Sequence, residues 1–562
     1  MSIKLFFVRH QLKENDMRQY EKRWSLVCLL IAMTGITLRA QTKTIPLWDK
    51  FEESFTLKTE KNPFTDIDFT ATFIHDGDGV RMTVDGFYDG DDTFKIRFMP
   101  TLKGKWTYTT RSSEKELNMQ EGSLICTDHA PDQKGMVQAG NDQDFVYPDG
   151  SLYHPVGTTS YAWIHSDNER QEQTYQTMEE TGFNKLRFCV FPNNSVYEWP
   201  ASYPFKLLKK SYSDELKKDV YLWDFSRFDV QFFQHLDKVV ERLRDMKIEA
   251  DLILFTPYDD GLWGFDRMSM ENNMRYLKYV VARLASYSNI WWSLANEWNL
   301  VKAKTHDQWI EMSKYVAEKD PYHHLLSIHG GTAIYIDYNL PFYTHASIQD
   351  QGPLYNFEGA ATVRNMIHKP ILFDEVCYEG DHASRWAQLS GEQMLERIWM
   401  GLIGGTYVTH GECFVDDMHN DKNYTGYAFL ATGGKFRGTC PSRIKFTRKI
   451  LDALPYSIRL ADQSWDEKTA CAGPDHYFIY FASEKPKTWT FNLPAKCNRW
   501  PRLGDGKTFK IDIIDTWNMT TTTVRDVFVS KLHSNRYRVI DKDGKSIKLP
   551  GKPYILLHIY SE

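Results

Sequence analysis

The stretch Ile290-Trp291-Trp292-Ser293-Leu294-Ala295-Asn296-Glu297-Trp298 decides the fold. It begins as a strand, with β-branched and aromatic residues and no charge, after the polar turn 286–289. It ends in Asn296 and Glu297, and a carboxylate at the end of an apolar strand is costly to bury unless it has a partner or a chemical task. In a (β/α)8 barrel, the carboxyl ends of the strands carry the active site.

A second apolar strand, residues 370–375, also ends in a carboxylate, Glu375. Alone, each glutamate is better explained as a helix N-cap or a surface salt bridge. Two of them, placed at strand ends in one series of alternating strands and helices, favour a pair that faces across a barrel mouth. A retaining glycoside hydrolase needs two such carboxyl groups about 5–5.5 Å apart, and we expect that separation here.

Length and composition limit the alternatives. A chain of 562 residues is too long for one core, so we expect about three domains. The net charge is −6 and no basic stripe occurs, so a nucleic-acid partner is not expected. The aromatic content of 14% suits clefts that stack against sugar rings, although large β cores account for most of these residues.

The N-terminus has the pattern of an export signal. A basic run at 18–23 precedes the apolar segment 24–36, which is too short to span a bilayer, and Ala40 fits the end of a cleavage site. We therefore predict a signal peptide over residues 1–40, with Met17 as a possible true start. The mature protein is expected in the periplasm or outside the cell, without a membrane span.

The cysteines do not form a recognisable framework. One of the eight, Cys28, falls inside the predicted signal, and the remaining seven are odd in number and widely scattered. No C-x-x-C pair or paired-histidine spacing supports a zinc site, so neither a metal nor another cofactor is expected.

Three regions follow the signal. Residues 42–150 consist of short alternating runs separated by Gly/Asp turns, which predicts a β-sandwich. Residues 151–455 alternate strands with helices, which predicts an α/β region, a (β/α)8 TIM barrel. Residues 456–562 return to short β runs and predict a second β-sandwich.

The barrel region contains eight predicted strands, at 156–163, 183–191, 250–255, 290–298, 325–329, 342–348, 371–376 and 406–414. Helices are predicted from 169 and at 230–246, 272–287, 307–318, 391–403 and 442–454, with a long insertion at 192–225. Glu297 then ends the fourth strand and Glu375 the seventh.

Five motifs carry a family resemblance. They are FSRFD at 225–229, EADLILFTPYD at 249–259, WWSLANE at 291–297, SIH at 327–329 and DEVCYEG at 374–380. With them the chain resembles the clan A glycoside hydrolases, and in particular glycosidases that have an apiosidase-like barrel between two β domains. The resemblance covers most of the chain after the signal, and it is specific for fold and mechanism rather than for substrate.

The resemblance also implies residue roles. It assigns Glu297 as the acid/base and Glu375 as the nucleophile of a retaining reaction. It matches Asn296 to a residue that binds the sugar hydroxyl next to the anomeric carbon, and Arg187 to one that supports the nucleophile. At strand six, where a tyrosine near the nucleophile is usual, this chain offers Tyr343, His345 or Gln349 instead, and the choice among them stays open.

Other candidates follow from position alone. Substrate contacts are expected from residues at or after strand ends: Trp163, Tyr258, Asp259, Trp263, Trp298, His329, His410 and Glu412. For the histidines, a structural hydrogen-bonding role is about equally expected. Trp298 or Trp292 would form an apolar wall beside Glu297, and strand alternation predicts that Asp374 points outward.

These observations favour an exported retaining glycoside hydrolase that acts on poly- or oligosaccharides through a two-glutamate double displacement. The alternative is a carbohydrate-binding protein on an inactive barrel, which the loss of either carboxylate would have favoured. A metal-dependent barrel hydrolase would want a His-x-His on strand one, and residues 157–161 have none. Loops that close over one end of the cleft would make the enzyme exo-acting. The sugar, the linkage and the oligomeric state do not follow from the sequence.

Overall fold

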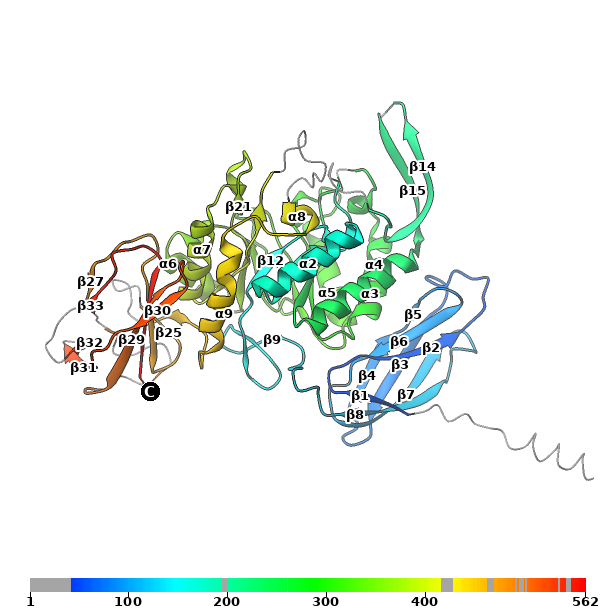
Figure 1. The fold of residues 1–562 in the computed structure, drawn as a ribbon. Helices are drawn as coiled ribbons and strands as arrows, with labels where there is room; N and C mark the ends of the chain where they lie inside the picture. The colour runs from blue at the N-terminus through cyan, green and yellow to red at the C-terminus, as the bar shows by residue number, and fades with distance from the viewer. Residues whose placement is uncertain are drawn as a thin grey trace, which may run out of the picture.

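The computed structural model describes residues 42–561 apart from 195–199, 216, 260, 416–427, 462–468, 491–492, 495–499, 501–502, 534–535 and 542–546. The predicted signal peptide therefore lies outside the described residues. A central α/β region lies between a β-rich N-terminal region and a β-rich C-terminal region (Figure 1).

The central region contains the eight predicted parallel strands. They are β12 (Gly157–Thr159), β13 (Lys185–Cys189), β16 (Glu249–Phe255), β17 (Ile290–Ala295), β18 (Leu325–Ser327), β19 (Ala346–Gln349), β20 (Ile371–Glu375) and β22 (Tyr407–Val408). The first five form one sheet and the last three another. Single parallel bridges, Thr158 with His410 and His329 with Ser347, link the two sheets at both of their edges.

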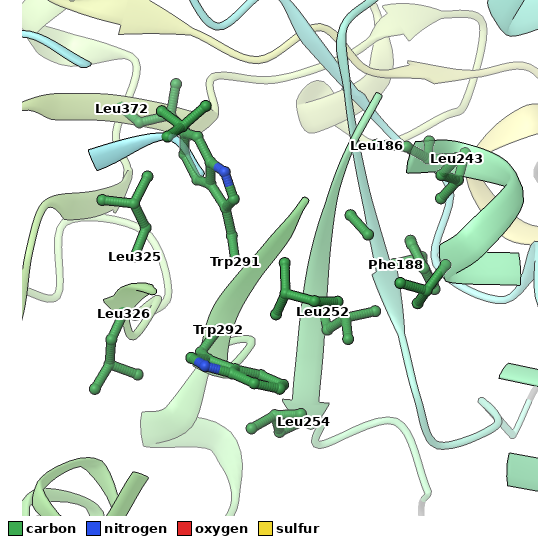
Figure 2. Packing of buried hydrophobic residues seen from close by; sticks show 14 of the residues in the cluster. Leu186, Phe188, Leu243, Leu252, Leu254, Trp291, Trp292, Leu325, Leu326 and Leu372 are labelled. Atoms are coloured by element: carbon green, nitrogen blue, oxygen red, sulfur yellow. The ribbon is translucent and has the colours of Figure 1, made fainter. Parts of the chain in front are cut away.

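Helices follow most of these strands. They are α2 (Asn168–Thr181), α3 (Val230–Asp245), α4 (Met270–Leu284), α5 (His306–Lys319), α6 (Phe357–Met366), α7 (Gly391–Ile403), α8 (Ala428–Thr432) and α9 (Ile444–Asp452). Helix α6 and the short α8 were not predicted from the sequence, whereas α7 has the predicted bounds. Alternation along β17 sends Trp291 and Trp292 to opposite sides of the strand (Figure 2). Trp291 donates to Glu249 and Trp292 to Asp320, so both buried indoles have partners.

The insertion after β13 is a long hairpin rather than an irregular loop. Its strands β14 (Phe205–Ser213) and β15 (Lys218–Phe228) pair antiparallel and project beyond the body of the central region (Figure 1). Short 3-10 turns, η1 (Trp163–His165), η2 (Phe265–Arg267) and η3 (Trp298–Leu300), occur in the loops after β12, β16 and β17. Others are η4 (Gly352–Leu354), η5 (Arg385–Ala387) and η6 (Cys440–Arg443), and β21 (Glu379–Gly380) pairs with β23 (Glu412–Cys413).

The N-terminal region contains β1 (Lys43–Pro46), β2 (Phe51–Thr56), β3 (Phe69–His75), β4 (Arg81–Asp85), β5 (Phe87–Tyr88), β6 (Thr93–Phe98), β7 (Gly104–Ser112) and β8 (Glu121–Thr127). They form a five-stranded and a three-stranded sheet. Buried Arg97 joins this region to the central region, because it donates to Asp237 at 2.8 Å and to the carbonyl of Arg283 at 2.8 Å. The small sheet of β9 (Gln138–Ala139), β10 (Phe145–Val146) and β11 (Leu152–Tyr153) leads into the central region.

The C-terminal region contains β24 (Arg459–Leu460), β25 (Thr469–Cys471), β26 (His476–Tyr480), β27 (Thr488–Trp489), β28 (Leu493–Pro494), β29 (Thr508–Asp515), β30 (Thr520–Thr523), β31 (Phe528–His533), β32 (Arg536–Asp541), β33 (Ile547–Lys548) and β34 (Ile555–Tyr560). Both terminal regions are therefore β-rich, as predicted, while their arrangement as sandwiches stays a prediction. Cys471 is disulfide-bonded. None of the described helices has the length and apolar character needed to cross a membrane.

Candidate active site

Both predicted glutamates line one cavity at the carboxyl ends of the strands. The cavity has a volume of about 440 Å³. Its walls come from the segments that follow different strands, and they include Tyr161, Asn193, Tyr258, Glu297, Gln349, Glu375, Cys377, Tyr378, Arg385 and Trp386. The strand order thus brings together residues that are far apart in the sequence.

Glu375 is the last residue of β20 and is buried. Its Oε1 accepts from the Tyr161 hydroxyl and lies 3.4 Å from Nη1 of Arg187. Its Oε2 accepts from Nε2 of Gln349 at 2.6 Å. Burial and the neighbouring Glu375 carboxylate both raise the pKa of Tyr161, so its hydroxyl stays protonated and remains a donor. These donors stabilise the ionised form of Glu375.

Glu297 has a different, less buried environment. It lies two residues beyond the end of β17 and adopts a left-handed backbone conformation, with φ of 43° and ψ of 51°, before η3 begins. Its Oε2 accepts from the Tyr258 hydroxyl at 2.8 Å, and its Oε1 accepts from Gln349 at 3.2 Å. Both donors are neutral side chains. A non-glycine residue in this conformation is strained, and such strain is found preferentially at functional sites.

Gln349 joins the two glutamates. Its Nε2 lies 3.2 Å from Glu297 Oε1 and 2.6 Å from Glu375 Oε2, so these two oxygens are at most 5.8 Å apart, the sum of the two distances. Of the three residues offered by strand six, Gln349 is therefore the one that touches Glu375. Tyr343 instead bonds Ser313, and His345 bonds Thr344.

Arg187 and Asn296 connect the surroundings of the two glutamates. Arg187 Nη2 donates to Asn296 Oδ1 at 2.5 Å, and Asn296 Nδ2 donates to the Tyr258 hydroxyl at 2.6 Å. Both Arg187 and Asn296 are fully buried. Burial lowers the pKa of Arg187, but Asp374, Tyr161 and Glu375 raise it by more than burial lowers it. The cation therefore persists beside Glu375.

Asp374 does not point outward, contrary to the alternation argument. Its carboxylate accepts from Lys185 at 3.1 Å and from Thr409 at 2.7 Å in the interior. The pairing of β19 with β20 shifts at this point, since Ile348 pairs with Phe373 but Gln349 pairs with Glu375. This bulge interrupts the alternation, so that consecutive carboxylates can both face inward. Burial opposes the charge of Asp374, but Lys185 and Arg187 lower its pKa.

Several predicted contact residues do not reach the cavity walls. Asp259 is buried and accepts from the backbone amides of Trp263 and Phe265, so it shapes its own loop. Trp263 packs against Tyr203 and Phe265 on the far side of that loop. Trp163 packs against Tyr175 and Phe188 behind the strands. Trp298 turns away from the cavity and contacts His306.

The predicted histidines and Glu412 are also buried away from the cavity walls. Burial lowers the pKa of His329 to about 4 and that of His345 to about 3, so both rings are neutral. His410 bonds Thr158 through Nδ1. Glu412 accepts from the amides of Arg437 and Gly438, and burial raises its pKa to about 8. His345 and His410 thus have structural hydrogen-bond partners, whereas neither ring nitrogen of His329 has a partner among the described residues.

Among the described residues, one group of side chains could hold a metal ion. Ligand atoms of Glu379, His410 and Cys440 lie within 4.8 Å of one another, and all three residues are buried. Glu379 already accepts from the amides of Thr439 and Cys440, which gives its carboxylate a structural role without an ion. This group lies behind Tyr378 rather than in the cavity, because Gly411 next to His410 packs against the Tyr378 ring.

Sequence reasoning missed two tyrosines of the cavity, Tyr161 and Tyr378. Tyr161 follows β12 and bonds Glu375, and its hydroxyl lies 3.3 Å from that of Tyr378. Tyr161 therefore occupies the tyrosine position beside Glu375 that was sought on strand six. A polar group just after strand one was the available signal, since all strand ends meet at this face.

Three regions of the chain match known protein families. An apiosidase-like catalytic domain matches residues 140–477. The chain belongs to the apiosidase-like family. Domains of unknown function match on either side of this apiosidase-like region, DUF5060 at residues 44–113 and DUF5605 at 465–560. These matches follow the β-rich, α/β and β-rich order of the structure.

Solved structures agree with the apiosidase-like assignment. A Bacteroides vulgatus protein described as a glycoside hydrolase is 45% identical, with a TM-score of 0.88 over 93% of this chain and 100% of that one. A second structure named glycoside hydrolase is 12% identical, with a TM-score of 0.55 over 78% of this chain and 99% of that one, and supports the TIM-barrel-like fold alone. No curated protein matches the chain.

Proposed function

We propose that this apiosidase-like protein is a retaining glycoside hydrolase, with Glu375 as nucleophile and Glu297 as acid/base. The observation that carries the proposal is Gln349, whose Nε2 reaches oxygens of both glutamates. The resulting limit of 5.8 Å between those oxygens agrees with the separation of about 5–5.5 Å in retaining enzymes. An inverting enzyme keeps its carboxyl groups about 6.5–9.5 Å apart to admit a water molecule.

The surroundings of the two glutamates support their roles. Arg187 and the Tyr161 hydroxyl favour the ionised form of Glu375, as a nucleophile requires. Glu297 accepts only from the neutral Tyr258 and Gln349 side chains, and no cation forms an ion pair with it among the described residues. Glu297 is therefore the better candidate for a carboxyl that is protonated when substrate binds.

In the first step, Glu375 attacks the anomeric carbon while the bond from that carbon to the leaving oxygen breaks. Glu297 gives its proton to the leaving oxygen, and a glycosyl ester forms on Glu375. In the second step, Glu297 accepts a proton from water, and the resulting hydroxyl attacks the anomeric carbon and releases Glu375. Asn296 is fully buried, does not line the cavity and is bonded to Arg187 and Tyr258, so it positions the Tyr258 hydroxyl beside Glu297 in both steps.

The arrangement of the sheets supports two further inferences about the fold. We infer that the eight strands form a closed barrel, because single bridges join the two sheets at both edges. We infer β-sandwiches at both ends of the chain, where the two N-terminal sheets and the large C-terminal sheet supply the layers. The cavity of about 440 Å³ is small for a polymer and favours an exo-acting enzyme that takes a chain end.

We also propose that the protein is exported. The pattern of residues 1–40 motivates this, and the disulfide at Cys471 supports it, since structural disulfides are typical of oxidising compartments. The test is N-terminal sequencing of protein recovered from its native compartment. A mature start at or near Gln41 is expected, and intact residues 17–40 would contradict the proposal.

A panel of aryl glycosides and oligosaccharides tests the enzymatic proposal, with Glu375→Ala as the blank. Proton NMR of an early time point then reads the configuration of the first anomer released. The proposal expects the substrate's own configuration. If the opposite anomer appears first, the retaining mechanism is wrong even though the glycosidase assignment stands. If a long substrate yields mixed oligomers early, the exo reading is wrong.

A further inference from the structure

The loop that carries Tyr258 to the active site also forms one wall of a second groove. This groove has a volume of about 590 Å³ and lies between the loop and the β14–β15 hairpin. Lys218, Asp219 and Tyr221 line it from the hairpin, and Trp263, Asp266 and Arg267 line it from the loop. The proposed reaction uses none of these residues.

The loop wall is braced from within. The carboxylate of Asp259 accepts from the amides of Trp263 at 2.7 Å and Phe265 at 2.6 Å. Gly261 and Gly264 take left-handed conformations, with φ of 71° and 83°, that other residues rarely adopt. The groove therefore has a preformed wall rather than a loose loop.

The hairpin is docked onto this wall by aromatic side chains. Trp223 Nε1 donates to the carbonyl of Trp263 at 2.8 Å. The ring of Trp223 lies parallel to that of Tyr221, with an interplanar angle of 3° and centroids 5.7 Å apart. Tyr203 contacts Trp223, Tyr221 and Trp263 behind them. A row of aromatic rings thus leads from the hairpin to the loop.

Charged groups surround the aromatic base. Asp219 is paired with Lys210 at 2.9 Å, and Arg267 Nε lies 3.4 Å from Asp266 Oδ1. The Arg267 side chain is 56% exposed, so its guanidinium can still meet a ligand. Trp223 and Trp263 are 7% and 5% exposed, so Tyr221 is the partly exposed ring of the groove among these three. An aromatic ring with carboxylates and a guanidinium around it suits a sugar, which presents apolar ring faces and a rim of hydroxyls.

We propose that this groove binds a sugar unit of the substrate remote from the bond that is cleaved. The choice of a sugar as ligand rests on the proposed glycosidase function. Tyr258 and Trp263 are five residues apart, so even a fully extended chain would separate them by no more than about 18 Å. A polymer whose end occupies the active-site cavity can therefore extend toward the groove.

The hairpin offers a matched pair of variants. Tyr221→Ala removes a ring from the groove, while Leu222→Ala changes the next residue along β15, whose side chain points to the opposite face and is 57% exposed. Arg267→Ala removes a charge from the other wall and serves as a second groove variant. All three changes lie at solvent-accessible positions, and thermal unfolding checks that each variant is folded.

The test is native electrophoresis through gels that contain xylan, β-mannan, pectin or arabinogalactan. All variants carry Glu375→Ala as well, so that no polymer is degraded. The Glu375→Ala protein without a further change is the parent. We expect at least one polymer to retard the parent and its Leu222→Ala variant equally. Tyr221→Ala should weaken that binding about tenfold, the loss expected for one well-packed aromatic contact. Arg267→Ala should weaken it by a smaller factor.

Three results would overturn the proposal: no polymer retards the parent, both groove variants bind like the parent, or Leu222→Ala loses as much affinity as Tyr221→Ala. The last result would place an interaction on the outer face of the hairpin. Because binding is measured without turnover, the two proposals fail separately. Retardation that depends on Tyr221 in a protein that hydrolyses no glycoside would refute only the enzymatic function.

Discussion

Glu249 and Glu375 lie at opposite ends of the parallel strands and are equally buried, with 7% and 6% of their surface exposed. Glu249 begins β16 and accepts from Trp291 Nε1 at 2.9 Å. Glu375 ends β20 and meets Tyr161, Arg187 and Gln349. Burial raises the pKa of Glu249 to about 8, so near neutrality this carboxyl is mostly protonated. The comparison teaches that partners, rather than burial, decide which buried glutamate can act as an anion.

The partners of Glu375 come from three other strands or their ends, which meet only at the carboxyl-terminal face. Glu297 lies at the same face but has only neutral donors. The three glutamates therefore form a series: one protonated and structural, one with neutral partners, and one beside a cation. Changes to one member of this series, or to one of its partners, should therefore differ in the size of their effects.

The largest effect is expected when the two catalytic glutamates are removed in turn. Glu375→Ala should abolish turnover on every substrate, because no glycosyl ester can form. Glu297→Ala should spare the first step on substrates with activated aryl leaving groups but lose about 10²–10⁴-fold on natural glycosides. Comparing kcat/KM for both kinds of substrate measures the difference.

Added azide separates the roles further. Azide needs no base, so it should rescue Glu297→Ala and give a glycosyl azide of retained configuration. Rescue of Glu375→Ala with an inverted azide would confirm Glu375 as the nucleophile. The reverse pattern in the two variants would mean that the roles are exchanged.

Removal of the cation should have the next largest effect. Arg187→Met leaves Glu375 without its charged partner, and the loss of a preorganised charged donor costs about 10²–10³-fold in kcat. Arg187→Lys keeps the charge and is the control, so it should retain more of kcat than Arg187→Met. Wild-type kcat in an Arg187→Met variant with a lowered unfolding temperature would show that the cation serves folding alone.

Two tyrosine variants, one beside each catalytic glutamate, should lower kcat/KM by a smaller factor than the loss of Arg187. Tyr161→Phe removes a hydroxyl from Glu375, and Tyr258→Phe removes one from Glu297. A hydrogen bond to a charged group is worth about 1.5–3 kcal/mol, so each change should lower kcat/KM roughly 10- to 100-fold. Tyr161→Phe should lose activity equally on natural and activated aryl glycosides, whereas Tyr258→Phe should lose more on natural glycosides, because Tyr258 contacts the acid/base. If both variants lose the same factor on both kinds of substrate, the two hydroxyls do not act on different groups.

The sequence was most informative where chemistry and local pattern coincide. The apolar strands that end in Glu297 and Glu375 were readable, because their order in the strand series fixes their place at one face. Tyr161 was missed because it follows a strand of only three residues, and the inward position of Asp374 depends on a bulge that has no sequence signature here. Asp259 and Trp263 lie in the expected loop, but the path of that loop is set by backbone hydrogen bonds to Asp259.

The hairpin shows a different limit. Residues 218–228 contain four aromatic side chains and a valine, which favour a strand, yet their lysine, arginine and two aspartates resemble a solvated loop. Pairing with β14 and docking through Trp223 decide the outcome, and both are tertiary contacts. Sequence patterns alone therefore placed the insertion correctly without giving its structure.

The smallest effect should come from Glu249, the structural member of the series, and it should appear in stability rather than in activity. The pKa of Glu249 is about 8 in the folded protein but about 4.3 in an unfolded chain. Between these values the folded state holds a proton that the unfolded state has lost. The free energy of unfolding therefore falls as pH rises through this window, by up to about 1.4 kcal/mol per pH unit from this group.

Glu249→Gln keeps an oxygen that can accept from Trp291 but removes the titration. Between pH 5 and pH 7 the free energy of unfolding should fall by roughly 1–3 kcal/mol more in the wild type than in this variant. The range lies below the full effect at its lower end because Glu249 lines a cavity that water can enter. Urea unfolding at both pH values measures the difference, with Glu311→Gln on the exposed face of α5 as the control. Equal losses in wild type and Glu249→Gln would mean that Glu249 is ionised in the folded protein. Burial with one neutral donor would then suffice for a carboxylate here, and the contrast with Glu375 would no longer rest on its partners.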